Sequence, residues 1–447
     1  MTLLELAQRV AAQAGPGEAV EAFASHSVTS SVTVFRGDVE KLSSAETRGV
    51  GVRVVVDGRL GFASTADLSD GGLRFALGEA RANAGYTSSD VGNVLPAPAP
   101  YEPLDGISVP ALREVPMGDK VARALELERR TLGTDPRIAS VPAASYGDAW
   151  GEVAIASSTG VAAAYDSTTC YVTVYALARQ GEETQTGLGF SDGRGWQDVD
   201  LAAAAGEAAA RATRLLDSRK PATARVPVVF DPMVTAQFLG VLADAVSAES
   251  VQKGRSLLAG RVGEAVLGQG LSLIDDGRLL DGPGAAPVDD EGVPTGRTVL
   301  VDAGELRGYL HNTETATRVG GSSTGNASRG GYGSTPGVAP TNLFLDGSAL
   351  PVDDLLRRAD GGLYVQEVKG VHSGVNPVSG EVSVGATGLW IRDGALGEPV
   401  REVTVSSTLL DMLRGVTALA DDRRFFPFGG SLAGATLLVG EMTVAGS

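Results

Sequence analysis

The sequence predicts an α+β protein of two domains, the first a duplicated helix–antiparallel meander–helix unit and the second rich in β structure. Long segments in which apolar and polar residues alternate, as in half-buried strands, are flanked by a few amphipathic helices. The strand and helix that end near residue 84 resemble those that end near residue 212. From about residue 223 onward, strand patterns and glycine-rich turns dominate.

The first copy begins with a helix over residues 2–14, where apolar side chains recur at helical spacing. Alternating segments over 21–64 predict four or five antiparallel strands, with tight turns at 36–38 and 56–59. An Asp/Ser cap then begins a helix over 68–84. The first copy is therefore predicted to be helix, meander, helix.

The second copy follows a proline-rich linker at about 87–115. A helix is predicted over 117–133 and further strands over 137–178. The last strand and helix, "GLGFSDGRGWQDVDLAAAAGEAAARA" at 187–212, are similar to "RLGFASTADLSDGGLRFALGEARANA" at 59–84. A duplicated unit of this kind packs its helices on one face of a sheet.

The domain boundary is predicted between 1–222 and 223–447, where an exposed basic segment leads into a different pattern. The second domain begins with a strand over 226–230 and an apolar helix over 233–254. After that helix, strands and glycine-rich turns continue to the end, interrupted by a short helix near 408–415.

The composition excludes several classes of function. The 447-residue chain has a formal net charge of −17 and a pI near 4.7, which oppose non-specific binding to nucleic acid or anionic membranes. No apolar run reaches the roughly 18 residues of a membrane-spanning helix, and the N-terminal segment lacks the pattern of a signal peptide. The single cysteine, Cys170, is expected in the core and fits a reducing cytoplasm.

The stretch "GGSSTGNASRGGYGSTPGV" at 320–338 consists almost entirely of small and polar residues. A phosphate-binding loop needs a following helix and a Gly-Lys-Ser/Thr element, whereas this stretch leads into "APTNLFLDG", which predicts a strand. Strand patterns on both sides also argue against disorder. We therefore expect an ordered, irregular loop with a functional role.

Three histidines are present, His26, His311 and His372, and none belongs to a His-Glu-x-x-His motif. His26 is expected to be a half-exposed strand residue. His372 precedes Ser373, but neighbours in a predicted strand point to opposite faces, which argues against a catalytic pair. The acidic turn at 289–292 has oxygen atoms of the kind that hard cations prefer, although we expect a solvated turn.

Four segments carry a more specific pattern. They are "VEKLSSAETRGVGVRVVVDGRLGFAST" at 39–65, "DDEGVPTGRTVLVDAGELRGYLHNTETATRVGGSSTGNA" at 289–327, "LYVQEVKGVHSGVNPVSGEVSVGATGLWIRDGALGEPVREVTVSSTLLDMLRGV" at 363–416, and "GATLLVGEMTVAGS" at 434–447. The second segment joins an acidic Glu-Gly-Val turn, a downstream Arg, a hairpin and a Ser-Thr-Gly-Asn-Ala loop. Together the four resemble the TldD/PmbA family over essentially the whole chain, and the second domain is then expected to be of the TldD/PmbA type.

The resemblance implies a bacterial cytoplasmic peptidase system. In this family a TldD subunit holds zinc on a His-Glu-x-x-x-His helix with a further ligand from a late cysteine, and a PmbA subunit, also called TldE, pairs with it and lacks that motif. Here Gly240, Val241 and Asp244 lie about where His, Glu and the second His would be, and no cysteine follows Cys170. The resemblance is therefore to PmbA/TldE, and zinc is expected only in a TldD-like partner.

The same resemblance places the stretch 320–338 near a chamber between subunits. Thr324, Asn326, His372 and Ser373 are predicted to bind substrate, and neither a catalytic residue nor a metal ligand is predicted. The leading hypothesis is a non-catalytic subunit that forms a heterodimer with a TldD-like subunit and acts on flexible peptides. The alternatives are a metal-free homodimer that tailors or binds a peptide or an amino-acid-derived metabolite, and a chaperone-like module for flexible peptides.

Overall fold

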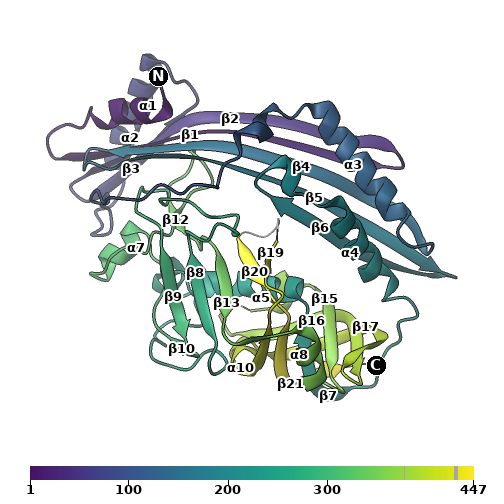
Figure 1. Cartoon of the computed structure of the whole chain (residues 1–447). Helices are drawn as coiled ribbons and strands as arrows, with labels where there is room; N and C mark the ends of the chain where they lie inside the picture. Colours follow the sequence, from purple (N-terminus) through teal and green to yellow (C-terminus); the bar gives the residue numbers. More distant parts are fainter. Residues whose placement is uncertain (377, 427–430, 447) are drawn as a thin grey trace.

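The computed structural model describes residues 1–376, 378–426 and 431–446. A long, curved sheet from the N-terminal half of the chain arches over a β-rich domain from the C-terminal half (Figure 1). The predicted α+β class is confirmed, and β structure dominates the C-terminal domain.

The arching sheet has six antiparallel strands in the order β3-β2-β1-β4-β5-β6. Its strands are β1 (Glu18–Phe35), β2 (Asp38–Val56), β3 (Arg59–Thr65), β4 (Ile138–Ser157), β5 (Ala162–Gln180) and β6 (Glu183–Gly193). The helices of this half are α1 (Leu3–Ala11), α2 (Asp70–Ala84), α3 (Met117–Leu132) and α4 (Leu201–Thr213), with the 3-10 turns η1 (Pro110–Glu114) and η2 (Trp196–Asp198). Because β1 pairs with β4, the two three-stranded meanders lie side by side in one sheet.

The segment 21–64 forms three strands, so the prediction of four or five is wrong. Strands β1 and β2 run for 18 and 19 residues and are joined at Arg36 and Gly37, whose φ angles of 53° and 78° suit a two-residue hairpin. The serine-rich middle of β1 has weak β propensity, yet Ser30 and Ser31 pair with β2 on one side and β4 on the other. Backbone hydrogen bonds to strands on both sides therefore stabilise a segment whose own β propensity is weak.

The duplicated pattern has a packing cause. Helices α1 and α2 cover one end of a face of the sheet, and α3 and α4 cover the other end, each pair over its own apolar core. The matching residues Gly61 and Gly189 lie under α2 and α4, where a Cβ would come within 1.9 Å of the Ala80 carbonyl oxygen and 2.0 Å of the Ala204 carbonyl oxygen. Only glycine permits this approach, so the repeated Leu-Gly-Phe reflects the same helix–sheet contact in both copies.

The C-terminal half contains two main sheets. The first sheet is a closed ring of the strands β7 (Ala224–Phe230), β15 (Leu363–Lys369), β16 (Glu381–Arg392), β17 (Ala395–Thr408) and β21 (Leu437–Ala445). The ring closes because β7 pairs with both β15 and β21. Strands β18 (Val416–Ala420) and β14 (Ala349–Leu350) extend this sheet from β21. The second sheet comprises β10 (Glu305–Leu306), β9 (Arg297–Asp302), β8 (Ser272–Asp276), β13 (Leu343–Asp346), β20 (Leu432–Gly434) and β19 (Arg424–Phe425). Strands β11 (Ala327–Ser328) and β12 (Gly337–Val338) pair with each other. The helices are α5 (Pro232–Ala245), α6 (Ala248–Gln252), α7 (Thr313–Arg318), α8 (Val352–Arg358), α9 (Val371–Gly374) and α10 (Leu409–Arg414).

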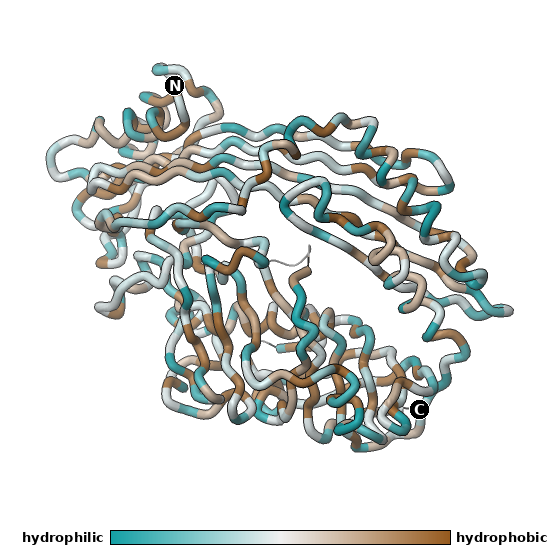
Figure 2. The backbone as a smooth tube through the Cα atoms, viewed as in Figure 1, coloured by the Kyte–Doolittle hydropathy of each residue, from teal (hydrophilic) through white to brown (hydrophobic). Residues whose placement is uncertain are grey.

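The core of the β-rich domain is packed around α5, whose side chains Phe238 and Leu242 are buried against both sheets. Figure 2 shows hydrophobic residues throughout the strands of this domain. The helix expected over 233–254 is interrupted because Ser247 forms a β-bridge with Leu310, after which the chain continues as α6. In the described ranges, no helix is long and apolar enough to cross a membrane.

Candidate functional site

One face of the arching sheet is free of helices and carries small polar side chains along its middle. Alternate residues of β1, such as Val20 and Val32, pack under the helices, so the residues between them point to the opposite face. Farther along that face, Glu21 contacts Arg329 of the β-rich domain, so the face is turned toward this domain. Its hydroxyl-bearing residues on β1 are Ser25, Ser27, Thr29, Ser31 and Thr33.

Buried charged side chains join the two domains at one end of this face. Arg53 of β2 donates from Nε to Glu21 Oε1 (2.9 Å) and from Nη1 to Glu291 Oε1 of the β-rich domain (2.9 Å). Arg329 donates to Glu21 from the other side and to the main-chain oxygen of Asp290 (3.1 Å). The side chains of Glu21, Arg53, Glu291 and Arg329 are at most 6% exposed. With Asp290 they form what we call the interdomain charge cluster.

The acidic turn belongs to this cluster, so the expectation of a solvated turn is wrong. Asp289 Oδ1 accepts two main-chain N–H groups of its own turn (both 2.9 Å), and Oδ2 accepts the N–H of Ala327 (3.0 Å). Glu291 Oε2 accepts the N–H of Thr313 at the start of α7 (2.9 Å). The residue types of this turn are typical of solvent-exposed turns, which is why exposure was expected. They carry no information about the strands β1 and β2, which cover the turn in the folded protein.

Burial controls the ionisation of these acids. It raises the pKa of Asp289 to about 8, assisted by the charge of Glu291, and raises the pKa of Asp290 to about 6, opposed by Arg329. Burial by itself would also raise the pKa of Glu21, but the charges of Arg329 and Arg53 outweigh it and lower that pKa. Within the part of the chain that the structure describes, no three His, Cys, Asp or Glu side chains are arranged to hold a metal ion.

The glycine-rich stretch 320–338 reaches from the β-rich domain to the sheet. A Cβ at Gly49 would lie 2.4 Å from the Tyr332 ring, and one at Gly51 would lie 2.3 Å from the Tyr332 carbonyl oxygen. Glycine therefore lets the loop lie directly on β2. Arg329 enters the charge cluster from the same loop. The expectation of an ordered, irregular loop is confirmed, and the loop joins the two domains.

Thr324 and Asn326, two of the predicted substrate-binding residues, lie within this loop. Asn326 is 1% exposed, and its amide nitrogen donates to Asp275 Oδ2 (2.6 Å) and to the main-chain oxygen of Ala339 (3.1 Å). Its amide oxygen accepts from the Thr324 hydroxyl (2.6 Å), which in turn accepts the N–H of His311 (2.8 Å). These bonds close the loop and tie it to β8. A substrate-binding role for the two residues stays a prediction.

His372 and Ser373 belong to the short helix α9, so the strand predicted there is wrong. Gly370, with φ 78°, turns the chain at the end of β15. Ser373 is exposed, and its hydroxyl donates to the main-chain oxygen of Gly370 (3.2 Å). The side chain of His372 lies outside the described part of the structure. No described hydrogen bond or ion pair joins α9 to Thr324 or Asn326, and the substrate-binding role of His372 and Ser373 stays a prediction.

The outer side of α5 carries the three positions compared with a zinc motif. Phe238 is buried, whereas Gly240 and Val241 are partly exposed and Asp244 is exposed. Glycine and valine side chains have no donor atom for a metal, and Asp244 contributes one carboxylate. Cys170 lies in the other domain, in the core as expected, and burial raises the pKa of its thiol to about 12.

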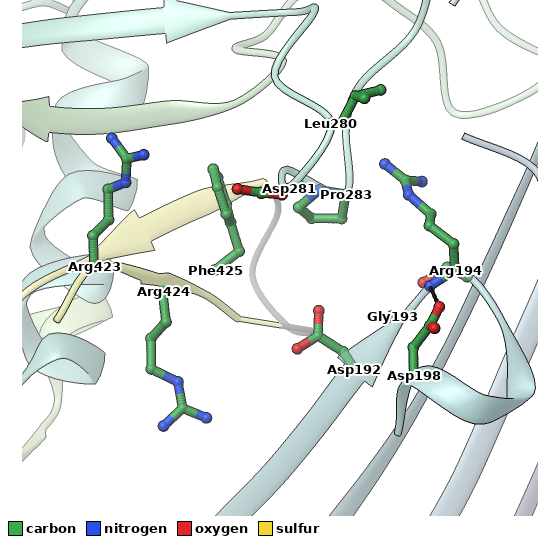
Figure 3. Close-up of a pocket in the computed structure, with 11 residues that line it drawn as sticks. Asp192, Gly193, Arg194, Asp198, Leu280, Asp281, Pro283, Arg423, Arg424 and Phe425 are labelled. Atoms are coloured by element: carbon green, nitrogen blue, oxygen red, sulfur yellow. Dashed lines mark hydrogen bonds between the residues drawn. The ribbon is translucent and has the colours of Figure 1, made fainter. Parts of the chain in front are cut away.

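A cavity of about 400 Å³ lies elsewhere on the interface between the two domains. Its walls come from the end of β6, the turn 280–283 and the start of β19 (Figure 3). In the view of Figure 3, the Phe425 ring stands between Arg423 and Asp281. The charged residues that line the cavity are Asp192, Arg194, Asp198, Asp281, Arg423 and Arg424.

Some of these charges have partners within the protein. Arg424 donates to Glu207 of α4 (2.9 Å) and stacks over the Phe190 ring (3.9 Å). Asp198 accepts the main-chain N–H of Arg194 (3.0 Å). The guanidinium of Arg194 donates to two main-chain oxygens at 2.6 and 3.4 Å. Asp192, Asp281 and Arg423 form no ion pair with a described residue, although the charges of Arg424 and Arg194 act on Asp192.

Sequence patterns do not reveal the charge cluster as a whole, although one signal for it is present. Glu21 and Arg53 stand in otherwise apolar strand segments, "AVEAFA" and "VGVRVVV". A charge in such a segment is buried only when it is paired, so each residue predicts a partner without saying which. The charges at the cavity offer no such signal, because they lie at strand ends and turns, where charged residues are ordinary.

Three domain models of one family match consecutive parts of the chain. PmbA/TldA metallopeptidase domain 1 matches residues 20–84, the central domain matches 110–216, and the C-terminal domain matches 223–446. Metalloprotease PmbA of Escherichia coli O157:H7 is 28% identical over 451 residues, which cover 100% of this chain and 95% of that protein.

Solved structures share the fold. A protein of Thermotoga maritima described as a candidate modulator of a DNA gyrase has a TM-score of 0.91 and 26% identity, and the match covers 99% of this chain and 100% of that one. TldE from Thermococcus kodakarensis has a TM-score of 0.88 and 22% identity, with coverage of 96% and 97%. The second likeness is one of fold.

Proposed function

Since the chain belongs to the PmbA/TldD metallopeptidase family, we propose that it is the PmbA/TldE-like subunit of a cytoplasmic two-subunit peptidase. In this proposal a TldD-like partner holds the zinc, and this chain helps to form the space that holds a flexible peptide. The outer side of α5 is the observation that carries the proposal. Gly240 and Val241 offer no metal-binding atom there, and Asp244 offers a single carboxylate. These residues do not fit a zinc site, so we assign no catalytic step to this chain.

The helix-free face of the sheet supports a role in holding peptide. Ser27, Thr29 and Ser31 present hydroxyl groups on this face, and a hydroxyl both donates to and accepts from peptide groups. Small side chains also leave room for an extended peptide and impose little preference for the amino-acid sequence of that peptide. Flexible peptides are the substrate class that suits such a surface.

We expect the partner to bind through the β-rich domain. Gly240 and Val241 on α5 are partly exposed, and Val241 also packs against the core of this domain. An obligate contact of this kind buries on the order of 2,000 Å² or more. A second copy of the chain is the alternative occupant, and light scattering of the chain alone and with a TldD-like protein distinguishes the two.

The proposal is tested by purifying the chain alone and together with a partner that carries His-Glu-x-x-x-His. We expect no stoichiometric zinc in the chain alone, stoichiometric zinc in the heterodimer, and hydrolysis of an unstructured peptide by the heterodimer only. Tightly bound zinc in the chain alone that is lost on changing His311 or His372 contradicts the proposal. So does a monomer that neither binds nor activates the partner.

A further inference from the structure

The cavity between β6 and β19 is lined by charged groups of both signs that form no ion pair with a described residue. Among the described residues, Asp192, Asp281 and Arg423 form no ion pair, and Asp281 and Arg423 are exposed. The guanidinium of Arg423 is held 4.3 Å from the centre of the Phe344 ring. Asp192 is partly buried, which raises its pKa, and the charges of Arg424 and Arg194 oppose this rise. The cavity therefore presents carboxylates to a positive group and a guanidinium to a negative group of the same ligand.

We propose that this cavity binds a small zwitterion, namely a free amino acid or a short peptide with both termini free. The carboxylates of Asp192 and Asp281 receive the ammonium group, and the guanidinium group of Arg423 receives the carboxylate. The proposal concerns binding to this chain alone and so does not depend on the peptidase role. If that role holds, the ligand has the chemistry of a peptidase product.

The distribution of charge favours a zwitterion over a ligand of one sign. The unpaired groups come from three elements, with Asp192 at the end of β6, Asp281 on the turn 280–283 and Arg423 just before β19 (Figure 3). A simple cation would lie close to the arginines, and a simple anion would lie close to the aspartates. A ligand that carries both charges meets a partner for each.

The size and the apolar lining of the cavity fit the same ligand class. About 400 Å³ lies within the range of small-molecule sites. Leu280, Pro283 and Phe425 supply apolar surface between the charged groups, which suits the carbon atoms that separate an amine from a carboxylate. The site therefore selects ligands by their charged ends, and it contacts the carbon atoms between those ends without selecting for their arrangement.

Titration of glycine, diglycine and triglycine into the purified chain tests the proposal, because these probes share both end groups and differ in their spacing. We expect saturable binding of at least one probe, with a Kd of about 10 mM or tighter, by calorimetry or NMR. Acetylating its amine or amidating its carboxylate should each weaken binding by about tenfold or more, since a charge-assisted hydrogen bond is lost.

Two variants show which residue binds the amine and which residue binds the carboxylate of the ligand. Asp192→Asn should remove the preference for a free amine and keep the preference for a free carboxylate, and Arg423→Gln should do the reverse. Matched controls are Asp353→Asn on α8 and Arg225→Gln on β7, which alter the same residue types away from the cavity. We expect both controls to keep both preferences.

Three results overturn the proposal: no saturable binding of any probe, equal binding of free and blocked probes, or unchanged preferences in both variants. Each variant is judged by its preference between probes, so a general loss of folding does not imitate the expected result. The measurement uses the chain without a partner or zinc, so its failure is distinct from failure of the peptidase role.

Discussion

Two groups of charged residues lie between the arching sheet and the β-rich domain, and they differ in what surrounds each charge. In the interdomain charge cluster, Arg53 and Arg329 contact carboxylates and are almost fully buried. At the cavity, Asp192 and Arg423 line the open space and form no ion pair with a described residue, although the charges of Arg424 and Arg194 act on Asp192. The same residue types therefore form a structural joint at one place on the interface and a candidate binding site at another.

The two groups have different roles because the charges of the cluster have oppositely charged partners in the protein, whereas the charges at the cavity form no ion pairs. Removing one member of a buried, fully paired cluster leaves the opposite charge without water and without a partner, which costs several kcal/mol. Removing a charge beside a solvent-filled space changes the free energy of unfolding little, because water replaces it. Variants at matched positions in the two groups should therefore differ strongly in stability.

Arg329→Met is expected to have the largest effect. It keeps most of the side-chain volume but leaves Glu21 with Arg53 as its remaining partner, so the free energy of unfolding should fall by about 3–5 kcal/mol. Chemical denaturation measures it. Arg423→Met is the matched control at the cavity and should lie within about 0.5 kcal/mol of the unchanged chain. Equal losses in the two variants would contradict the distinction between joint and site.

Asn326→Ala should have the next largest effect, because it deprives the buried Asp275 carboxylate of a hydrogen bond in the loop that carries Arg329. We expect a loss of about 1–3 kcal/mol in thermal or chemical unfolding. Asn83→Ala, on the exposed side of α2, is the control. A variant with unchanged stability and reduced peptide turnover in the heterodimer would instead support the substrate-binding role predicted for Asn326.

Asp290→Asn should change how stability depends on pH. Burial raises the pKa of Asp290 from an ordinary 3.8 to about 6, so its stabilising contribution is complete below about pH 4 and is lost as the pH rises through about 6. Asparagine does not titrate, so the unchanged chain should lose stability relative to the variant over this pH window. Above the window, the difference in the free energy of unfolding between the two proteins should stay constant. Glu21 acts in the opposite direction, but it is present in both proteins. A constant difference between pH 4 and 7 would refute the assignment.

Asp192→Asn should have the smallest effect on stability, within about 0.5 kcal/mol, because this carboxylate forms no ion pair with a described residue and lies beside the cavity. Differential scanning calorimetry without ligand measures it. A loss comparable to that of Arg329→Met would show that Asp192 belongs to a structural joint.

The sequence by itself determined the fold class, the duplicated unit and the family, because each of these rests on patterns that are local or contiguous. Alternation along β1 to β6 and helical spacing in α1 to α4 follow from which face each residue buries. The matching residues Gly61 and Gly189 mark the same helix–strand contact in both copies. The expectations for Cys170 in the core and for His26 as a partly exposed strand residue are also confirmed.

Only the tertiary structure decided the surroundings of the charged residues. Arg53 and Glu291 are 238 residues apart in the sequence, and no local pattern indicates that one covers the other. The composition of the acidic turn predicts solvent because most turns lie at the surface, yet packing of the sheet onto this turn removes the solvent. The cavity arises in the same way: Asp192 and Arg423 come from separate segments, and the space between them exists only after the domains pack. Burial, and with it the strength and role of a charge, is a property of long-range packing.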